Sequence, residues 1–229
     1  MRRHVLAIVL TTTILTPLTA TTALASEVSP GLQTAMLNSA DIPSYTNDMG
    51  AGVMQTACAT YRKGYSEPVS SRAATNTVVS GFSSDFLGNG NWQSTVGSYR
   101  SPSAAKQAYT DLQMRAKALC TYSRNMNVGD DGDLVMATVS SRYVALPALS
   151  GLPRFAVASS TIIWDLDGAM NAHPTMGYQG VNGSSYTVFT VDGSRMTSVE
   201  VSSTRTLDNS ERALAQRLAP TVAERVRNS

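Results

Sequence analysis

Histidine is the side chain best suited to proton transfer at neutral pH, and the sequence contains two, His4 and His173. A Ser–His–Asp hydrolase needs only one histidine, and serines are abundant in this chain. His173, however, precedes Pro174 in a glycine-rich stretch, and no G-x-S-x-G nucleophile motif is present. We therefore interpret His173 as a polar loop residue, and a secreted hydrolase that uses it is the least favoured functional hypothesis.

Two short acidic runs could in principle bind a metal ion. Residues 130–133 (DDGD) and 165–168 (DLDG) each resemble part of a calcium loop. Neither run has the spaced oxygen ligands or the closing glutamate of an EF-hand, and Asp with Gly is typical of turns. We therefore expect no metal site and no cofactor.

Aromatic side chains are the remaining candidates for a ligand site. Ligand pockets favour aromatic walls with a polar tip. Trp164, Tyr178 and Tyr186 lie in or next to residues 165–184, a stretch rich in glycine. We expect a cleft where this stretch overhangs a sheet, with Tyr178 and Tyr186 supplying rings and hydroxyls. Core packing is the default interpretation of Trp164.

The first 25 residues are typical of a secretory signal peptide. Arg2 and Arg3 form a basic start, an apolar run follows from Val5, and residues 23–25 (ALA) supply a small-x-small cleavage site. The apolar run is too short and too rich in threonine to be a stable membrane span. We expect a secreted protein, extracellular or associated with the cell wall.

The mature chain is expected to carry no net charge. Removal of Arg2 and Arg3 lowers the Lys+Arg count from 18 to 16, which equals the Asp+Glu count of 16. The total charge therefore does not indicate nucleic acid or an acidic membrane surface as a partner. A hydrophobic content of 42% is ample for a single domain over residues 26–229. The expected partner is a small extracellular ligand or another protein, with no stable membrane insertion.

Cys58 and Cys120 are the two cysteines of the chain. Two cysteines in an exported protein most often pair, and two free buried thiols are the alternative. A bridge would hold residues 44–74, which are polar and contain several glycines, and which we expect to be irregular.

An amphipathic helix over residues 102–120 is the best defined element. Ser101 suits the N-cap, and Pro102 suits the first helical position because its missing N–H has no partner there. A strand headed by Trp92 precedes this helix. The expected buried face follows steps of three and four residues and consists of Ala105, Ala108, Tyr109, Leu112, Ala116, Leu119 and Cys120.

Strands are expected before and after this helix. Residues 75–82 and 134–144 read as strands, and residues 155–164 form the most apolar one, with large side chains on both faces and therefore a central place. The clearest hairpin turns around residues 192–193.

The register of that hairpin depends on the length of its loop. A two-residue turn around residues 192–193 would pair Phe189 with Met196 and put Val199 and Val201 on the opposite face. A three-residue loop brings Phe189, Val191, Val199 and Val201 together, and we favour it for that reason.

A second helix is expected from Asp208 to the end of the chain. Asp208 and Glu211 fit a capping box, and Pro220 should kink the helix or start a second short one. Its apolar row consists of Leu214, Leu218, Val222 and Val226. The order of elements predicts an α+β fold in which a curved, mainly antiparallel sheet packs against a central helix and a C-terminal helix, with one disulfide.

Several short motifs follow this order of elements. They are LNSADIP at residues 37–43, Cys58, Trp92, VGSYRSPSAA at residues 96–105 with Tyr109, and LC at residues 119–120. In these motifs the chain resembles the extracellular sensor domain of PknH-type actinobacterial kinases and the free-standing exported proteins of that family. The resemblance implies a cleft-bearing domain that binds an extracellular ligand, and it implies no catalysis. Family members usually carry a second disulfide between later strands, and this chain departs from them because no cysteine follows Cys120.

The leading hypothesis is therefore a secreted, non-catalytic ligand-binding or sensor-like domain. The alternative is an extracellular protease inhibitor that presents residues 165–184 to its target.

Overall fold

The computed structural model describes residues 30–43, 49–52, 54–62, 65–71, 74–80, 91–127, 136–165, 182–203 and 205–229. Its helices are α1 (Pro30–Ala35), α2 (Pro102–Leu119) and α4 (Asn209–Arg227). Its strands are β1 (Met49–Ala51), β2 (Met54–Arg62), β3 (Tyr65–Ser71), β4 (Asn76–Ser80), β5 (Asn91–Ser98), β6 (Thr121–Asn127), β7 (Met136–Leu149), β8 (Leu152–Asp165), β9 (Asn182–Asp192) and β10 (Arg195–Ser203).

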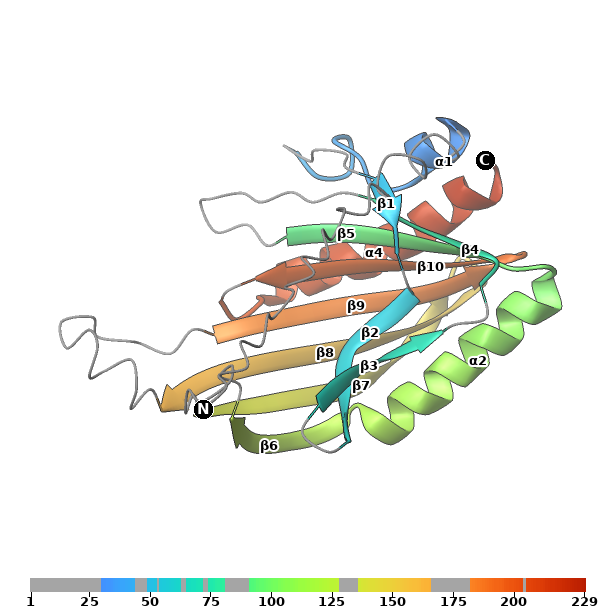
Figure 1. Cartoon of the computed structure of the whole chain (residues 1–229). Coiled ribbons are helices and arrows are strands. Elements are labelled where there is room, and N and C mark those ends of the chain that lie inside the picture. The colour runs from blue at the N-terminus through green and yellow to red at the C-terminus, as the bar shows by residue number, and fades with distance from the viewer. Residues whose placement is uncertain are drawn as a thin grey trace, which may run out of the picture.

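Eight of these strands form one antiparallel sheet in the order β1-β4-β5-β10-β9-β8-β7-β6, and β2 pairs with β3 separately (Figure 1). β8 lies inside the sheet between β7 and β9, as its apolar composition indicates. The α+β class, the antiparallel sheet, the C-terminal helix and the disulfide are all confirmed. No helix in the described part of the chain is long and apolar enough to cross a membrane.

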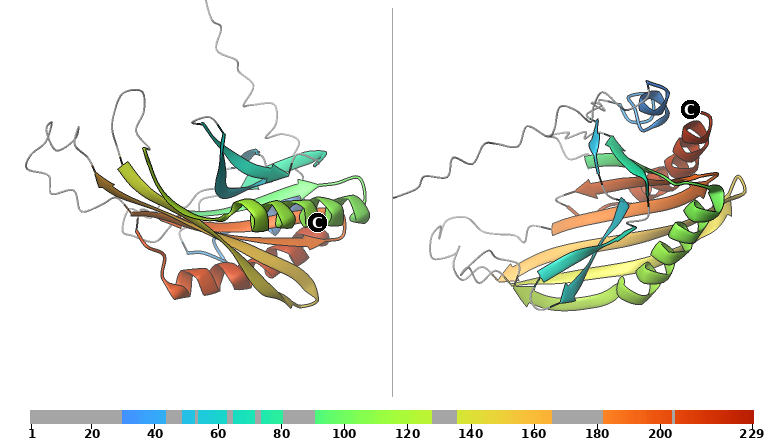
Figure 2. Two further views of the ribbon diagram at one scale, coloured as in Figure 1. Left: turned by 90° about the horizontal axis from the view of Figure 1, so that it is seen from below. Right: turned by 45° about the vertical axis from the view of Figure 1, so that its right-hand side comes forward.

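The sheet is covered on both faces. Figure 2 shows α4 against one face, and α2 with the β2–β3 hairpin against the other. Successive side chains of a strand point to opposite faces, so every central strand contributes side chains to the hydrophobic core on each face of the sheet. Val188 and Val199 belong to the core on the α4 side, whereas Phe155, Phe189 and Met196 belong to the core on the α2 side.

α2 begins as its sequence predicts. The Ser101 hydroxyl accepts a hydrogen bond from the Ala104 N–H at 3.2 Å, and Pro102 is the first helical residue. The predicted stripe is buried except for Leu119, which is 42% exposed. That expectation was wrong because the helix ends at Leu119 and the chain turns at Cys120 into β6.

The predicted disulfide is present. Cys58 of β2 and Cys120 are fully buried and bonded, with their Cα atoms 5.5 Å apart. The expectation that residues 44–74 are irregular was wrong, because β1, β2 and β3 lie there. Met54, Thr56 and Cys58 are buried at every second position, which is the strand signal in an otherwise polar segment.

The β9–β10 hairpin has a two-residue turn at Gly193 and Ser194, with Asp192 paired to Arg195. Gly193 has a φ of 56°, which glycine adopts at no steric cost. The preferred three-residue loop was therefore wrong. It grouped Phe189, Val191, Val199 and Val201 on one face, whereas this sheet is buried on both faces and needs an apolar set on each.

α4 starts with the predicted capping box between Asp208 and Glu211 and continues through Pro220, so no second helix starts there. Proline has no N–H to donate to the Gln216 carbonyl four residues earlier. The guanidinium of Arg154, in β8, donates to that carbonyl at 2.7 Å and to the Pro147 carbonyl at 2.9 Å. A strand of the sheet thus supplies the donor that the helix lacks.

Candidate functional site

The residues singled out in the sequence for ligand binding or chemistry are only partly described. His173 and Tyr178 lie outside the described residues, as do residues 130–133 and most of residues 165–184. Trp164 is the penultimate residue of β8, and its side chain is not described either. The roles of Trp164 and Tyr178 therefore stay predictions. Within the described residues, no three His, Cys, Asp or Glu side chains gather in a way that could hold a metal ion.

Tyr186 is placed on the α4 face of β9 and is 3% exposed. Its phenol oxygen accepts a hydrogen bond from Gln216 Nε2 of α4 at 2.8 Å. Burial raises the pKa of Tyr186, while that hydrogen bond and the charges of Arg212, Arg154 and Arg142 lower it. Tyr186 thus lies beneath α4, within electrostatic range of three arginines.

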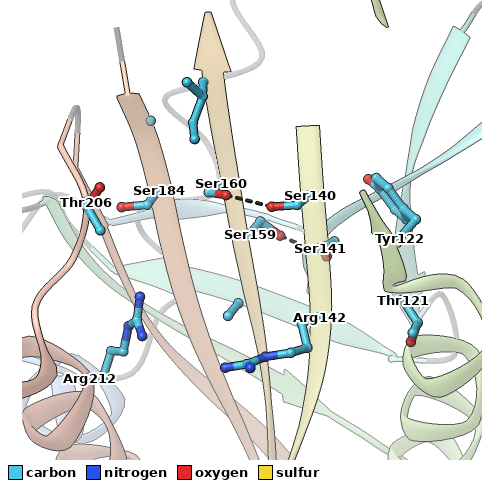
Figure 3. Close-up of a pocket in the computed structure, with 13 residues that line it drawn as sticks. Thr121, Tyr122, Ser140, Ser141, Arg142, Ser159, Ser160, Ser184, Thr206 and Arg212 are labelled. Carbon is cyan, nitrogen blue, oxygen red and sulfur yellow. Dashed lines mark hydrogen bonds between the residues drawn. The ribbon is translucent and has the colours of Figure 1, made fainter. Parts of the chain in front are cut away.

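A groove with a volume of about 620 Å³ is lined by two of these arginines, Arg142 and Arg212. We call it the serine–arginine groove (Figure 3). It is formed by β6 to β9, the start of α4 and the segment that precedes α4. Its lining residues are Thr121, Tyr122, Ser140, Ser141, Arg142, Ala158, Ser159, Ser160, Ile162, Gly183, Ser184, Thr206 and Arg212.

Strand register explains why the side chains of Ser140, Arg142, Ala158, Ser160 and Ser184 share one face, whereas those of Ser141 and Ser159 point to the opposite face. Arg142 is paired with Ala158, and Ser140 with Ser160, which in turn is paired with Ser184. Directly paired residues point to the same side of an antiparallel sheet, here the side of α4. α4 packs on β9 and β10, so the small side chains on β7 and β8 form the floor of a hollow beside it.

Serine hydroxyls contribute hydrogen-bonding groups to the groove. Ser140 and Ser160 are hydrogen-bonded at 2.7 Å on the α4 side of the sheet, whereas the Ser141–Ser159 hydrogen bond, at 3.0 Å, lies on the opposite side. A bonded pair of hydroxyls uses one of its two protons internally, so the other can be donated to a ligand. The Ser184 hydroxyl has a structural role, because it donates to the Arg205 carbonyl and accepts from a backbone N–H of the same segment.

The groove carries positive charge. Arg142 is exposed, Arg212 is half-buried, and no acidic side chain is among the described lining residues. The buried Nε of Arg212 has no hydrogen-bond partner. Glu211, which precedes Arg212 in α4, accepts hydrogen bonds from Arg205 through both of its carboxylate oxygens, at 2.7 and 3.0 Å. Two guanidinium groups therefore face a hydroxyl-rich cavity without a carboxylate in its lining.

The sequence analysis missed this groove. Its only local signals are the serine pairs at residues 140–141 and 159–160 and the arginine that follows the first pair, Arg142. Nothing in these short patterns indicates that the two strands are neighbours or that Arg212 lies over them.

A smaller cavity of about 380 Å³ lies on the other side of the molecule, between the start of α2 and the two hairpin turns. The buried Tyr109 hydroxyl, which has no hydrogen-bond partner, lines it. Its charges are mixed, because Lys106 and Asp192 both contribute, and Asp192 forms an ion pair with Arg227 at 3.1 Å. This cavity therefore lacks the uniform charge of the serine–arginine groove.

Neither a protein-family model nor a curated protein matches this sequence. Among solved structures, the fold is similar to the extracellular domain of PknH from Mycobacterium tuberculosis, with a TM-score of 0.47 and 10% sequence identity. The match covers 86% of this chain and 94% of that chain. The similarity is weak and concerns the arrangement of the elements only.

Proposed function

We propose that the protein is an exported, non-catalytic ligand-binding domain and that the serine–arginine groove holds its ligand. One observation carries the proposal: Arg142 and Arg212 share a hydroxyl-lined cavity whose described lining contains no carboxylate. The polar groups in the lining are hydroxyls and guanidinium groups, which bind and orient a ligand by hydrogen bonds and charge.

The position of Arg212 supports a binding role. Arg212 lines the groove, and a guanidinium group has several N–H donors that can bond to acceptor atoms of a ligand. The cavity volume of about 620 Å³ lies within the range of small-molecule sites.

The buried disulfide supports export. Disulfides persist in oxidising compartments and are rare where thiols are kept reduced. The bond between Cys58 and Cys120 joins β2 to the end of α2, and both sulfur-bearing side chains are fully buried. An exported, disulfide-stabilised domain fits the signal sequence that residues 1–25 resemble.

Chemical-shift mapping tests the location of the site. The mature protein, isotope-labelled, is titrated with a library of extracellular metabolites, glycans and lipid headgroups. Ligands should shift the amide signals of Ser140, Arg142 and Ser160, and Arg212→Gln should abolish those shifts. Arg217→Gln is the matched control, because Arg217 is exposed on the same helix and is not part of the groove lining.

Shifts confined to the cavity beside α2, with the groove residues silent, would show that the site is misplaced. Equal responses in the Arg212→Gln and Arg217→Gln variants would have the same meaning. Thermal unfolding of both variants establishes that each is folded before the titration is interpreted.

A further inference from the structure

The charge of the groove matches a doubly charged anion. Arg142 extends from β7 and Arg212 from the first turns of α4, and Figure 3 shows both side chains bordering the same space. Both charges act on the same phenol oxygen, that of Tyr186. A phosphate monoester carries a charge of about −1.5 to −2 at pH 7 and has three acceptor oxygens, whereas a carboxylate carries a single charge. Guanidinium groups bind phosphate oxygens in a bidentate manner.

The uncharged part of the groove matches a polyol. The Ser140–Ser160 pair, which lies on the same face as Arg142, retains one proton to donate, and both of its oxygens can also accept. Ligand hydroxyls have the same dual capacity, so they can bond to this serine pair. Ile162, which is 47% exposed, adds an apolar surface for the C–H groups of such a ligand.

We infer that the ligand of the serine–arginine groove is a phosphate monoester of a polyhydroxylated molecule, with the phosphate between Arg142 and Arg212 and the hydroxyls beside the Ser140–Ser160 pair. This inference rests on the function proposed above and adds the chemical class of the ligand. The same group occurs in a free sugar phosphate and in a phosphorylated lipid headgroup, so both sources are tested.

The soluble arm compares four probes by titration calorimetry on the mature protein: glucose 6-phosphate, glycerol 3-phosphate, inorganic phosphate and glucose. The two monoesters should bind with dissociation constants below about 1 mM and at least about tenfold more tightly than glucose. Arg142→Gln and Arg212→Gln should each weaken monoester binding by about ten- to a hundredfold, the loss expected for a charge-assisted hydrogen bond. Arg217→Gln should leave the affinity unchanged.

The double variant Ser140→Ala, Ser160→Ala separates the polyol from the phosphate. It should weaken binding of glucose 6-phosphate and leave binding of inorganic phosphate unchanged. An equal loss for both probes would contradict the placement of the hydroxyls along the serines.

The lipid arm measures co-sedimentation with phosphatidylcholine vesicles that either contain or lack phosphatidylinositol 4-phosphate. Binding that depends on the phosphorylated lipid and on Arg212 supports the headgroup as the source, and binding of the soluble monoesters alone supports a free metabolite. Failure of the monoesters in both arms overturns the inference.

The outcome for neutral probes distinguishes the two proposals. If glucose or another uncharged polyol shifts the amides of Ser140 and Ser160 as strongly as the monoesters do, the phosphate assignment is wrong while the groove remains a binding site. If neither charged nor neutral probes affect the groove, the proposed function fails together with the inference.

Discussion

Arg154 provides a direct test of how α4 tolerates its proline. Its guanidinium donates to the Gln216 carbonyl at 2.7 Å, which is the carbonyl that Pro220 leaves without an N–H partner. Arg154 is only 8% exposed, so water competes little for this bond. We predict that Arg154→Met destabilises the protein more when Pro220 is present than in a Pro220→Ala background.

The magnitude follows from one hydrogen bond. A bond that involves a charged group contributes about 1.5–3 kcal/mol, and an unsatisfied buried carbonyl costs about 1–3 kcal/mol. Arg154→Met alone removes this bond and the one to Pro147, and it also relieves the cost of a desolvated cation, so its net effect is smaller than the sum. In the Pro220→Ala background a backbone N–H is available to the Gln216 carbonyl. The coupling energy between positions 154 and 220 should therefore be about 1–2 kcal/mol.

Urea unfolding of four proteins measures this coupling: the wild type, the two single variants and the double variant. Trp92, which is 4% exposed, reports unfolding through its fluorescence. Thr221→Ala is the control partner for Arg154→Met, because Thr221 is exposed and adjacent to Pro220 in α4. That pair should be additive within about 0.5 kcal/mol. A coupling of Arg154 with Pro220 within the same limit would refute the reasoning.

Three further predictions concern other contacts. Replacing both Cys58 and Cys120 by alanine should lower the free energy of unfolding by about 4 kcal/mol, because the disulfide joins residues 62 positions apart. A loss below about 1 kcal/mol in urea unfolding would contradict this. Arg225 binds Asp41 through two hydrogen bonds, at 2.6 and 3.1 Å. A double-mutant cycle of Arg225→Gln with Asp41→Asn should therefore yield a coupling energy of about 1 kcal/mol. Additive effects of the two substitutions would show that the pair contributes nothing to stability. Burial raises the pKa of Glu200, so its carboxyl group binds a proton more tightly in the folded protein than in the unfolded chain. The free energy of unfolding should therefore fall as the pH rises from the pKa in the unfolded chain, about 4.3, through the pKa in the folded protein. Glu200→Gln should reduce that fall in unfolding experiments across this range, and an unchanged pH dependence would exclude Glu200 as its cause.

Features that depend on a few neighbouring residues could be predicted from the sequence. Ser101 and Pro102 set the start of α2, and Asp208 with Glu211 sets the start of α4, because a cap forms between residues within one turn of each other. The pairing of the two cysteines followed from their number and the export signal. These inferences required no knowledge of which elements are neighbours.

Features that depend on both faces of the sheet were decided by the tertiary structure. The β9–β10 register places Val199 with Val188 on the α4 side and Met196 with Val191 on the α2 side. A choice made from the hairpin alone favours one apolar face, because a two-stranded ribbon can bury only one. Packing of α4 on one face and α2 on the other reverses that preference.

The serine–arginine groove belongs to the same category. Ser140, Ser160 and Ser184 come from three strands, and only the register of β7, β8 and β9 brings their side chains into one row. Arg212 joins them because α4 begins beside that row and covers β9 and β10, not β7 and β8. The sequence by itself determined the strands that carry Ser140 and Ser160 and the helix that carries Arg212, since periodicity and capping are local, whereas Ser184 belongs to β9 and was expected at the end of the glycine-rich stretch. Which part of the sheet stays uncovered, and so which side chains can meet a ligand, depends on long-range packing that no local pattern encodes.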